Sequence, residues 1–347
     1  MKSTAEPFVS VVTPMYNGEA YLAECIESVL KQTYHNWEYL IVDNCSTDQS
    51  LAIAKRYADK DKRIRIHCNT SFLTVMENHN HALRLISKDS KYCKIVHADD
   101  WLFPECLERM VGLADENQTV GIVSAYRLEN VWVGLDGLPY NRPVIPGHEL
   151  CRSFLLGGPY VFGSPNSLLY RSDLIHQRER FYKNESRTFS DVETCLEVLQ
   201  ESDFGFVHQV LTYTRRHAET AGGALARRHA SGLTPIYLLT QFGRKYLNNQ
   251  EYEKRLKEVM DVYYHGLARS VLDFRAKEFW RYQKNALKEL GFSFSLWRVV
   301  RAFLVEGFRP INMVLMGLKN RIHIPDFWNG KRVKRIVSLL QPPPSQG

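Results

Sequence analysis

Residues 8–44 read FVSVVTPMYNGEAYLAECIESVLKQTYHNWEYLIVDN, and this stretch decides the fold. The β-branched run at residues 8–13 is typical of a buried strand, and Pro14 ends it. Apolar residues then recur at helical spacing from Leu22 to Leu30, and residues 37–44 predict a second strand. A strand, a helix and a strand in this order form a βαβ unit with two parallel strands.

The same alternation continues along the chain. Residues 63–68, 93–98 and 120–126 each predict a strand, with helical patterns between them. The sequence therefore predicts an α/β fold, Rossmann-like, with a mostly parallel central sheet covered on both faces. Residues 131–150 are rich in glycine and proline and predict a long loop, and residues 204–217 return to a strand pattern.

The C-terminal part of the chain is basic and helical in pattern. The 347 residues carry a net charge of +7, but from Leu225 onward 22 Lys and Arg face only 9 Asp and Glu. We expect an α/β domain over residues 1–222, a basic, mostly helical region over residues 223–336, and a disordered tail over residues 337–347. The basic region would suit an anionic membrane surface, nucleic acid, or no partner at all.

Composition excludes several classes of protein. Seven scattered cysteines without a C-x-x-C spacing argue against a disulfide framework or a zinc site, and for a reducing, cytoplasmic location. No secretory signal or membrane-spanning stretch is apparent. No G-x-G-x-x-G follows the first strand, which argues against a nicotinamide dehydrogenase, and the absence of an RNA-binding signature argues against a nucleic-acid partner.

Polar residues follow three of the predicted strands. They are Pro14 to Asn17, then Asp43 and Asn44, and then Asp99 and Asp100. In parallel sheets, ligands bind beyond the carboxyl ends of the strands, so these clusters predict one crevice. Asn and Asp are also common turn formers, which explains any single cluster equally well. Two adjacent carboxylates keep their charge with a cation or good solvation, and Mg²⁺ commonly binds one or two carboxylates plus substrate phosphates.

Several stretches of the sequence together resemble a known enzyme family. The stretch quoted above, continued by CSTDQS and later by KIVHADDWLFP at residues 94–104, resembles the family 2 glycosyltransferases of GT-A fold. The resemblance runs from about Pro7 to Thr220. It implies an inverting enzyme that uses a nucleotide-diphosphate sugar, with a UDP-sugar as the commonest donor, and Mg²⁺ or Mn²⁺. The acceptor would be a hydroxyl of a glycan or lipid-linked molecule.

The resemblance also implies roles for single residues of the donor site. Pro14, Tyr16 and Asn17 would line the nucleotide pocket, Asp43 would contact the base, and Asp99 would bind the metal, with Asp100 as the acidic residue after it. His97 stands where the family's D-x-D motif has its first carboxylate, and a neutral histidine can donate to a ribose hydroxyl or bind a metal.

A second segment departs from the family in the same way. NHNHAL at residues 78–83 resembles the family's ARNxGL, with His79 on the arginine and Asn80 on the asparagine, which would contact the nucleotide sugar. Alternatively, His79 and His81 lie on a solvated helix face.

The implied catalytic base lies near the end of the domain. In TFSDVETCLEVL, Asp191 matches the base of the family's ED pair, with Glu193 as the fallback; a helix N-cap is the alternative role of Asp191. His217 would approach the metal, and Arg216 would offset the pyrophosphate charge, unless both only edge a basic strand. Because His97 and His79 replace family residues, a degenerate protein that binds a nucleotide sugar or glycan without turnover is the competing hypothesis.

A membrane role is the last expectation. Residues 292–336 combine an aromatic and aliphatic face with many Lys and Arg, which is typical of helices that lie on an anionic membrane surface, and Pro310 favours two short helices over one. A helical subdomain packed on the catalytic domain is the alternative.

Overall fold

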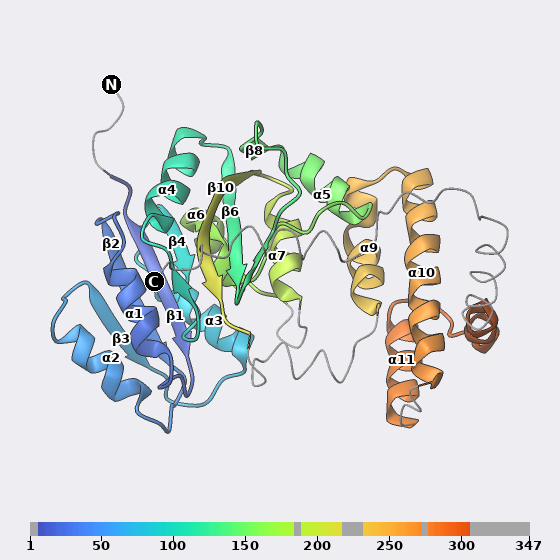
Figure 1. The fold of residues 1–347 in the computed structure, drawn as a ribbon, viewed down its shortest axis with the longest axis horizontal. Coiled ribbons are helices and arrows are strands. Elements are labelled where there is room, and N and C mark those ends of the chain that lie inside the picture. Colours follow the sequence, from blue (N-terminus) through green and yellow to red (C-terminus); the bar gives the residue numbers. More distant parts are fainter. Residues whose placement is uncertain (1–5, 184–188, 217–231, 273–276, 306–347) are drawn as a thin grey trace, which may run out of the picture. The chain divides into compact units, whose positions relative to one another are not determined.

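The structure, a computed structural model, describes residues 6–183, 189–216, 232–272 and 277–305 (Figure 1). The chain divides into two compact units. The first comprises residues 1–263 and 276–293, and the second comprises residues 264–275 and 294–347. The expected domain boundary at residue 222 falls outside the described residues and stays a prediction.

The described strands of the first unit form one sheet of ten strands (Figure 1). Its order is β3-β2-β1-β4-β9-β6-β10-β5, with β7 paired to β6 and β8 paired to β10. The strands are β1 (Val9–Met15), β2 (Trp37–Asp43), β3 (Ile64–Cys68), β4 (Tyr92–Ile95), β5 (Trp101–Leu102), β6 (Val120–Glu129), β7 (Trp132–Gly134), β8 (Val144–Ile145), β9 (Leu169–Arg171) and β10 (Asp203–Thr214).

The sheet is parallel where the sequence predicts it and mixed elsewhere. Strands β1 to β4 pair in parallel, and β6 pairs in parallel with β10. Strand β9 lies between β4 and β6 and is antiparallel to both. The carboxyl ends of β1, β2, β3, β4, β6 and β10 therefore reach the same edge of the sheet.

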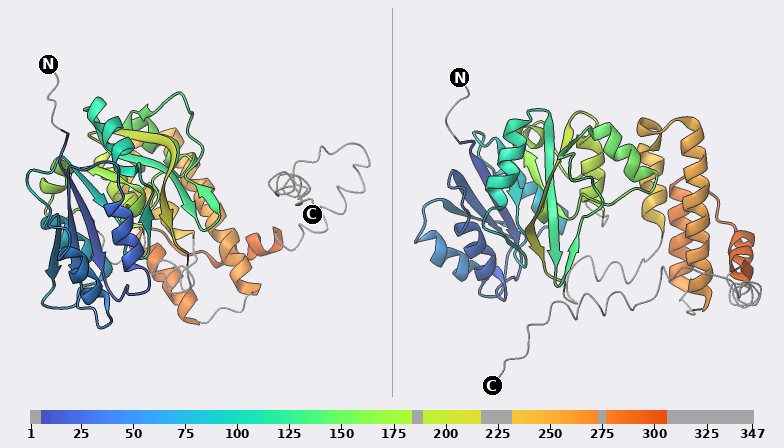
Figure 2. Two further views of the ribbon diagram at one scale, coloured as in Figure 1. Left: turned by 60° about the vertical axis from the view of Figure 1, so that its left-hand side comes forward. Right: turned by 45° about the horizontal axis from the view of Figure 1, so that its top comes forward.

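Helices cover the sheet on both sides (Figure 2). The buried faces of α1, α2 and α4 share one apolar core with alternate residues of the strands, such as Val9, Val11, Tyr39 and Ile41. Helix α3 contacts β1 and β2, and α7 contacts β6. The helices up to this point are α1 (Leu22–Leu30), α2 (Ser50–Ala58), α3 (Val75–Arg84), α4 (Cys106–Glu116), α5 (Gly147–Leu155), the short 3-10 helix η1 (Pro165–Ser167), α6 (Ser172–His176) and α7 (Ser190–Val198).

The described C-terminal residues are mainly helical, as the sequence predicts. They contain α9 (Leu233–Tyr246), α10 (Asn249–Leu272), α11 (Lys277–Glu289) and a helical stretch at residues 296–305. Helix α9 is tied to α7, because Tyr246 donates to the carbonyl oxygen of Leu196 at 2.5 Å. Within the described parts of the chain, none of the helices combines the length and hydrophobicity that crossing a bilayer requires.

One prediction about local structure is wrong. The glycine- and proline-rich stretch at residues 131–150 is not a plain loop, since it contains β7, β8 and the first turn of α5. These strands are two or three residues long and lie at the border of the sheet, so their sequence carries too little alternation to reveal them.

Candidate active site

The carboxyl edge of the sheet gathers most of the polar residues that the sequence singles out. Strand β4 ends at Ile95, and the chain then makes a turn in which the amide of Asp100 donates to the carbonyl oxygen of His97 at 3.0 Å. The turn brings one ligand atom from each of His97, Asp99 and Asp100 within 4.8 Å of one another. Such a cluster is the arrangement expected of a metal and diphosphate site.

The two carboxylates of this turn have different surroundings. Asp100 is buried and accepts from the backbone amide of Arg215 at 2.8 Å and from the hydroxyl of Thr214 at 3.5 Å. Its second oxygen also lies 3.4 Å from Nδ1 of His97. Asp99 is only partly buried. Asp100 therefore joins the turn to the end of β10, which leaves Asp99 as the better placed of the two to meet a ligand.

His97 faces these carboxylates directly. Burial lowers its pKa, but the contact with Asp100 and the charges of Asp100, Asp99 and Asp191 outweigh burial and raise the pKa above its usual value. The imidazole is thus held in a strongly acidic environment. It can contribute a nitrogen ligand when neutral or a hydrogen-bond donor in either form.

His79 is buried, which corrects the alternative of a solvated helix face. Its side chain is 6% exposed, Nδ1 lies 2.7 Å from the carbonyl oxygen of Val75, and its ring lies 5.5 Å from that of His97. Burial first, and then the charge of His97, lower the pKa of His79 to about 3. His79 is therefore a neutral, buried ring that packs beside His97. His81 is half-buried, with its Nε2 3.1 Å from Nε2 of His67.

The residues after β1 form a tight pair of loops with those after β2. Asn17 adopts a positive φ of 48°, which asparagine tolerates well, and its side-chain oxygen accepts from the amide of Thr47 at 2.8 Å. Asp43 is buried at the end of β2 and accepts from the amide of Ser46 at 3.2 Å. Pro14 is buried within β1, which continues to Met15, so Pro14 does not end the strand as the sequence predicts.

Tyr16 lies beside these loops and presents an aromatic surface. Its side chain is half-exposed and contacts Phe72 edge to face at 4.9 Å. Phe72 is itself 61% exposed, and the sequence analysis did not single it out.

Asn80 has a clear structural task. Its side-chain amide donates to the carbonyl oxygen of Tyr182 at 2.8 Å, and its side-chain oxygen accepts from the amide of the same residue at 2.9 Å. Asn80 thereby fixes the segment that precedes α7. Its expected contact with the donor stays a prediction.

Asp191 lies in the first turn of α7, but its side chain does not cap the helix. Its Oδ1 accepts from the amide of the next residue, Val192, at 2.8 Å. Burial raises the pKa of Asp191 to about 6, while these backbone hydrogen bonds and the charges of His97 and Arg127 oppose the shift. A carboxylate with such a pKa accepts a proton more readily than an ordinary aspartate does. The fallback residue, Glu193, is buried and accepts from the hydroxyl of Tyr237 at 2.6 Å, which favours a structural role.

The two arginines at the end of β10 point to different partners. Arg216 donates from Nε to Glu129 at 2.8 Å, and its side chain is 65% exposed. Arg215, which the sequence analysis did not select, donates to the carbonyl oxygen of Asp99 at 3.1 Å and to Glu24 at 2.5 Å. Arg215, rather than Arg216, is therefore bonded to the turn that carries the candidate metal ligands His97, Asp99 and Asp100. His217 lies outside the described residues.

The donor set fits a divalent cation. A hard cation prefers carboxylate oxygens, which Asp99 and Asp100 supply, and it completes its shell with phosphate oxygens and water. The nitrogen of His97 is a softer ligand that Mn²⁺ accepts more readily than Mg²⁺ does.

Comparisons with known proteins agree with this geometry. Residues 10–178 match the model of the family described as Glycosyl transferase family 2. The chain is 30% identical to "Putative glycosyltransferase EpsE" of Bacillus subtilis over 218 residues, which cover 62% of this chain and 75% of that protein. It is 27% identical over 201 residues to a protein of Haemophilus influenzae named "Uncharacterized glycosyltransferase", of which it spans 60%.

Solved structures show the same fold at low identity. Staphylococcus aureus TarS 1-349, in complex with UDP-GlcNAc, superposes with a TM-score of 0.61 at 18% identity, covering 82% of this chain and 80% of that one. Mannosyltransferase PcManGT of Pyrobaculum calidifontis, in complex with GDP-Man and Mn²⁺, gives 0.54 at 16% identity, covering 89% and 83%.

Proposed function

The chain belongs to glycosyltransferase family 2 and has the GT-A fold with a helical C-terminal part, and on this premise we propose an inverting reaction. A sugar would pass from a nucleotide-diphosphate sugar, a UDP-sugar first of all, to a hydroxyl of a glycan or lipid-linked acceptor. The observation that carries the proposal is the cluster of His97, Asp99 and Asp100 at the end of β4, on the sheet edge where β1 and β2 also end.

The nucleotide-sugar donor would bind at the carboxyl ends of β1, β2 and β4. Tyr16, Asn17 and Asp43 surround the ends of β1 and β2, which suits the nucleoside. Asp99 would hold Mn²⁺ or Mg²⁺ together with the diphosphate, and the cation would neutralise charge on the leaving group. His97 would either donate to a ribose hydroxyl or complete the metal shell.

Asp191 would act as the general base. Its carboxylate would take the proton from the acceptor hydroxyl while that oxygen attacks the anomeric carbon and the nucleoside diphosphate leaves from the opposite face. A single displacement of this kind inverts the configuration at that carbon. A retaining double displacement would need a second carboxylate as nucleophile, and Glu193, the nearest candidate along the helix, is engaged by Tyr237.

A two-step experiment tests the proposal. First, thermal shifts are measured with UDP, GDP, UDP-sugars and GDP-mannose, each with and without Mn²⁺. We expect stabilisation that requires both a nucleotide and the metal. Second, slow hydrolysis of the stabilising donor is followed by release of the nucleoside diphosphate. Binding without hydrolysis or transfer would favour the degenerate alternative, and no metal-dependent stabilisation by any nucleotide would refute the proposal.

The biological setting is proposed from the same relatives. The chain is also 30% identical over 137 residues to "Putative teichuronic acid biosynthesis glycosyltransferase TuaG" of Bacillus subtilis, whose name supports a role in polysaccharide or cell-envelope synthesis. The cytoplasmic location is proposed from the scattered cysteines. We also propose that residues 1–222 form the catalytic domain and that residues 223–336 form a separate basic region.

The helical stretch at residues 296–305 supports peripheral binding to an anionic membrane. Trp297, Val300 and Leu304 recur at helical spacing and are 71%, 40% and 49% exposed, with Arg298 and Arg301 beside them. Cosedimentation with vesicles that contain an anionic lipid should show binding that weakens with salt and disappears on truncation before Phe292. No binding at low salt would refute this part of the proposal.

A further inference from the structure

The hairpin of β6 and β7 exposes an unusual amount of apolar surface beside the candidate active site. Strand β6 ends at Glu129, the chain turns at Asn130 with a positive φ of 49°, and β7 begins at Trp132. The side chain of Trp132 is 73% exposed. Exposing an indole to water is unfavourable, so such a residue on a surface often marks a binding site.

The hairpin is joined to the metal-binding turn through the end of β10. The side-chain oxygen of Asn130 accepts from the amide of Arg216 at 3.2 Å and from the hydroxyl of Tyr213 at 3.4 Å. The preceding residue, Arg215, donates its amide to Asp100. The backbone amides of two consecutive residues, Arg215 and Arg216, therefore link the His97–Asp100 turn to the hairpin.

The strand register shows which side chains share a face with Trp132. Trp132 is the cross-strand partner of Glu129, and Gly134 is the partner of Arg127. Directly paired residues and residues two apart along a strand lie on one face of a sheet. One face of the hairpin thus carries the indole of Trp132 next to Glu129 and Arg127, and Gly134 adds no side chain there.

Charged groups continue along this face toward the candidate base. Glu129 forms ion pairs with both Arg127 and Arg216. The charge of Arg127 is also felt by Asp191. The row from Trp132 through Glu129 to Arg127 therefore runs from the exposed tip of the hairpin to the largely buried Arg127 side chain, whose charge acts on Asp191.

We propose that Trp132, with Glu129 and Arg216 beside it, forms the subsite that holds a sugar ring of a glycan acceptor. An indole offers a flat apolar surface to the C–H face of a pyranose ring, while a carboxylate and a guanidinium bond the hydroxyls at its rim. An apolar protein partner fits less well, because an ion pair borders the indole. The inference rests on the proposed transferase function and adds the acceptor class and its position.

The test separates acceptor binding from donor binding. Wild type, Trp132→Ala and Trp132→Phe are assayed with Mn²⁺ and the donor that stabilises the protein, using p-nitrophenyl glycosides of glucose, galactose, N-acetylglucosamine and mannose as soluble acceptors. Tyr282→Ala is the matched control, because Tyr282 is an aromatic residue of α11 that is 41% exposed and belongs to neither the candidate active site nor the hairpin. We expect Trp132→Ala to raise KM for the best glycoside roughly tenfold, Trp132→Phe to recover part of the loss, and Tyr282→Ala to have no effect. Donor affinity and donor hydrolysis should stay within about twofold of wild type in all variants.

Several outcomes would overturn the inference. An unchanged glycoside KM in Trp132→Ala would do so, and so would a parallel loss of donor hydrolysis, which would indicate a structural role. A wild-type protein that hydrolyses the donor but uses none of the glycosides would also contradict it. Failure of the proposed function has a different signature, because the wild type would then neither bind nor hydrolyse any donor.

Discussion

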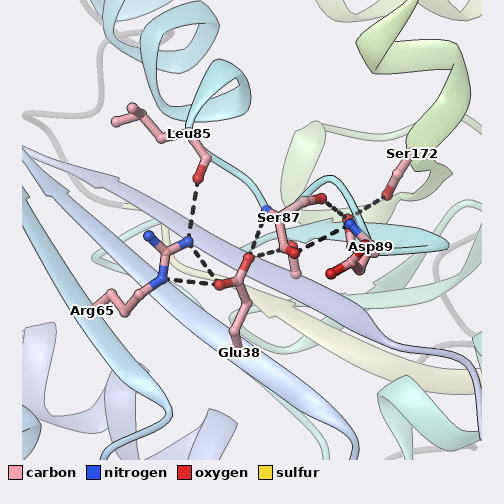
Figure 3. A network of polar contacts seen from close by, with 8 residues as sticks. Glu38, Arg65, Leu85, Ser87, Asp89 and Ser172 are labelled. Atoms are coloured by element: carbon pink, nitrogen blue, oxygen red, sulfur yellow. Dashed lines mark hydrogen bonds and ion pairs between the residues drawn. The ribbon is translucent and has the colours of Figure 1, made fainter.

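The two edges of the same sheet use carboxylates in opposite ways. At the amino edge, Glu38 accepts from the Ser10 hydroxyl at 2.6 Å, from the Ser87 amide at 2.8 Å, and from Nε and Nη2 of Arg65 at 2.9 and 2.7 Å (Figure 3). At the carboxyl edge, Asp99 is partly buried beside a histidine, and Asp191 has a raised pKa.

The difference shows how the environment decides the role of a carboxylate. Four donors hold Glu38 in place, so it joins β2 and β3 to the segment before β4 and has little capacity left for a ligand. The carboxylates at the other edge lie where a strand ends and a helix begins, and ligand atoms of Asp99, Asp100 and His97 cluster there. The Glu38 network at the amino edge therefore contributes to stability, whereas the carboxyl edge carries the groups that we propose take part in the reaction.

The largest effect should come from Asp99→Ala. Removing this carboxylate would take away the main oxygen ligand of the cation, whose charge stabilisation of the leaving group is worth several kcal/mol, roughly a thousandfold in rate or more. Transfer or donor hydrolysis with saturating Mn²⁺ is the measurement, and Tm checks the fold. Asp59→Ala, an exposed carboxylate after α2, is the control. Near-normal activity of the Asp99 variant would place the metal elsewhere.

Asp191→Asn should lower turnover by about 10² to 10⁴ while the affinity for the donor stays unchanged. A base works only when unprotonated, so wild-type turnover should fall as the pH drops below the Asp191 pKa of about 6, and the variant should lose this inflection. A pH profile of kcat measures this. A collapse of donor affinity would instead assign Asp191 to the donor site.

The same substitution has a predictable effect on stability. Because the folded state binds the Asp191 proton more tightly than the unfolded chain does, the free energy of unfolding falls as pH rises from about 4 to about 6. Asparagine removes this loss, so Tm of the variant at pH 7.5 should equal or exceed that of wild type. A lower Tm would indicate that the Asp191 charge has a structural partner.

At the amino edge, Glu38→Gln should affect stability and leave catalysis intact. A glutamine presents its amide nitrogen toward donors that the carboxylate satisfies, and it leaves Arg65 without its ion pair. We expect a loss of about 2 to 3 kcal/mol in the free energy of unfolding, measured by urea denaturation. The exposed pair Arg142–Glu149 is the control, because Glu149→Gln should cost less than about 1 kcal/mol. Equal losses in the free energy of unfolding would show that the network in Figure 3 stabilises the protein no more than an exposed ion pair does.

The parallel half of the sheet could be predicted from sequence, and the reason is its regular pattern. Strands β1, β2 and β4 are buried runs, β3 alternates between apolar and polar residues, and helical patterns separate them, so period and order alone define them. Strand β9 could not be found in this way. It is a three-residue strand inserted between β4 and β6, and its place depends on contacts between residues about 80 apart in sequence.

The candidate site likewise contains residues that a sequence motif reveals and residues that only the fold reveals. Asp99 and Asp191 could be selected because a motif places them at a strand end and at a helix start. Two of their neighbours could not, since Arg215, which bonds Asp99, and Arg127, whose charge acts on Asp191, are brought there by the pairing of β6 with β10. Arg215 and Arg216 are adjacent and chemically identical in sequence, and only the structure shows which one bonds the turn.

The two arginines offer a matched comparison. Arg215→Ala removes hydrogen bonds to the Asp99 carbonyl and to Glu24, which hold the turn in position. We expect UDP with Mn²⁺ to bind about tenfold more weakly, as measured by titration calorimetry. Arg216→Ala removes an exposed ion pair with Glu129 and should change this affinity by less than about threefold. The reverse order would show that Arg216 meets the diphosphate, as the family resemblance implies.

The smallest effect is expected from His97→Asp, and its sign is informative. The substitution restores the acidic residue of the family motif and adds a negative charge near Asp99, so Mn²⁺ should bind about three to ten times more tightly. The structure adds a cost, because His97 lies 3.4 Å from the buried Asp100 and a carboxylate there would repel it. The variant should therefore have a lower Tm than wild type without metal and should regain it when Mn²⁺ is added. His97→Asn, which removes the imidazole without adding a charge, separates the two effects and should show no gain in metal affinity. Weaker Mn²⁺ binding by the aspartate variant would mean that the imidazole itself is a ligand, and the carboxyl edge would then depend on a nitrogen where the family motif has an oxygen.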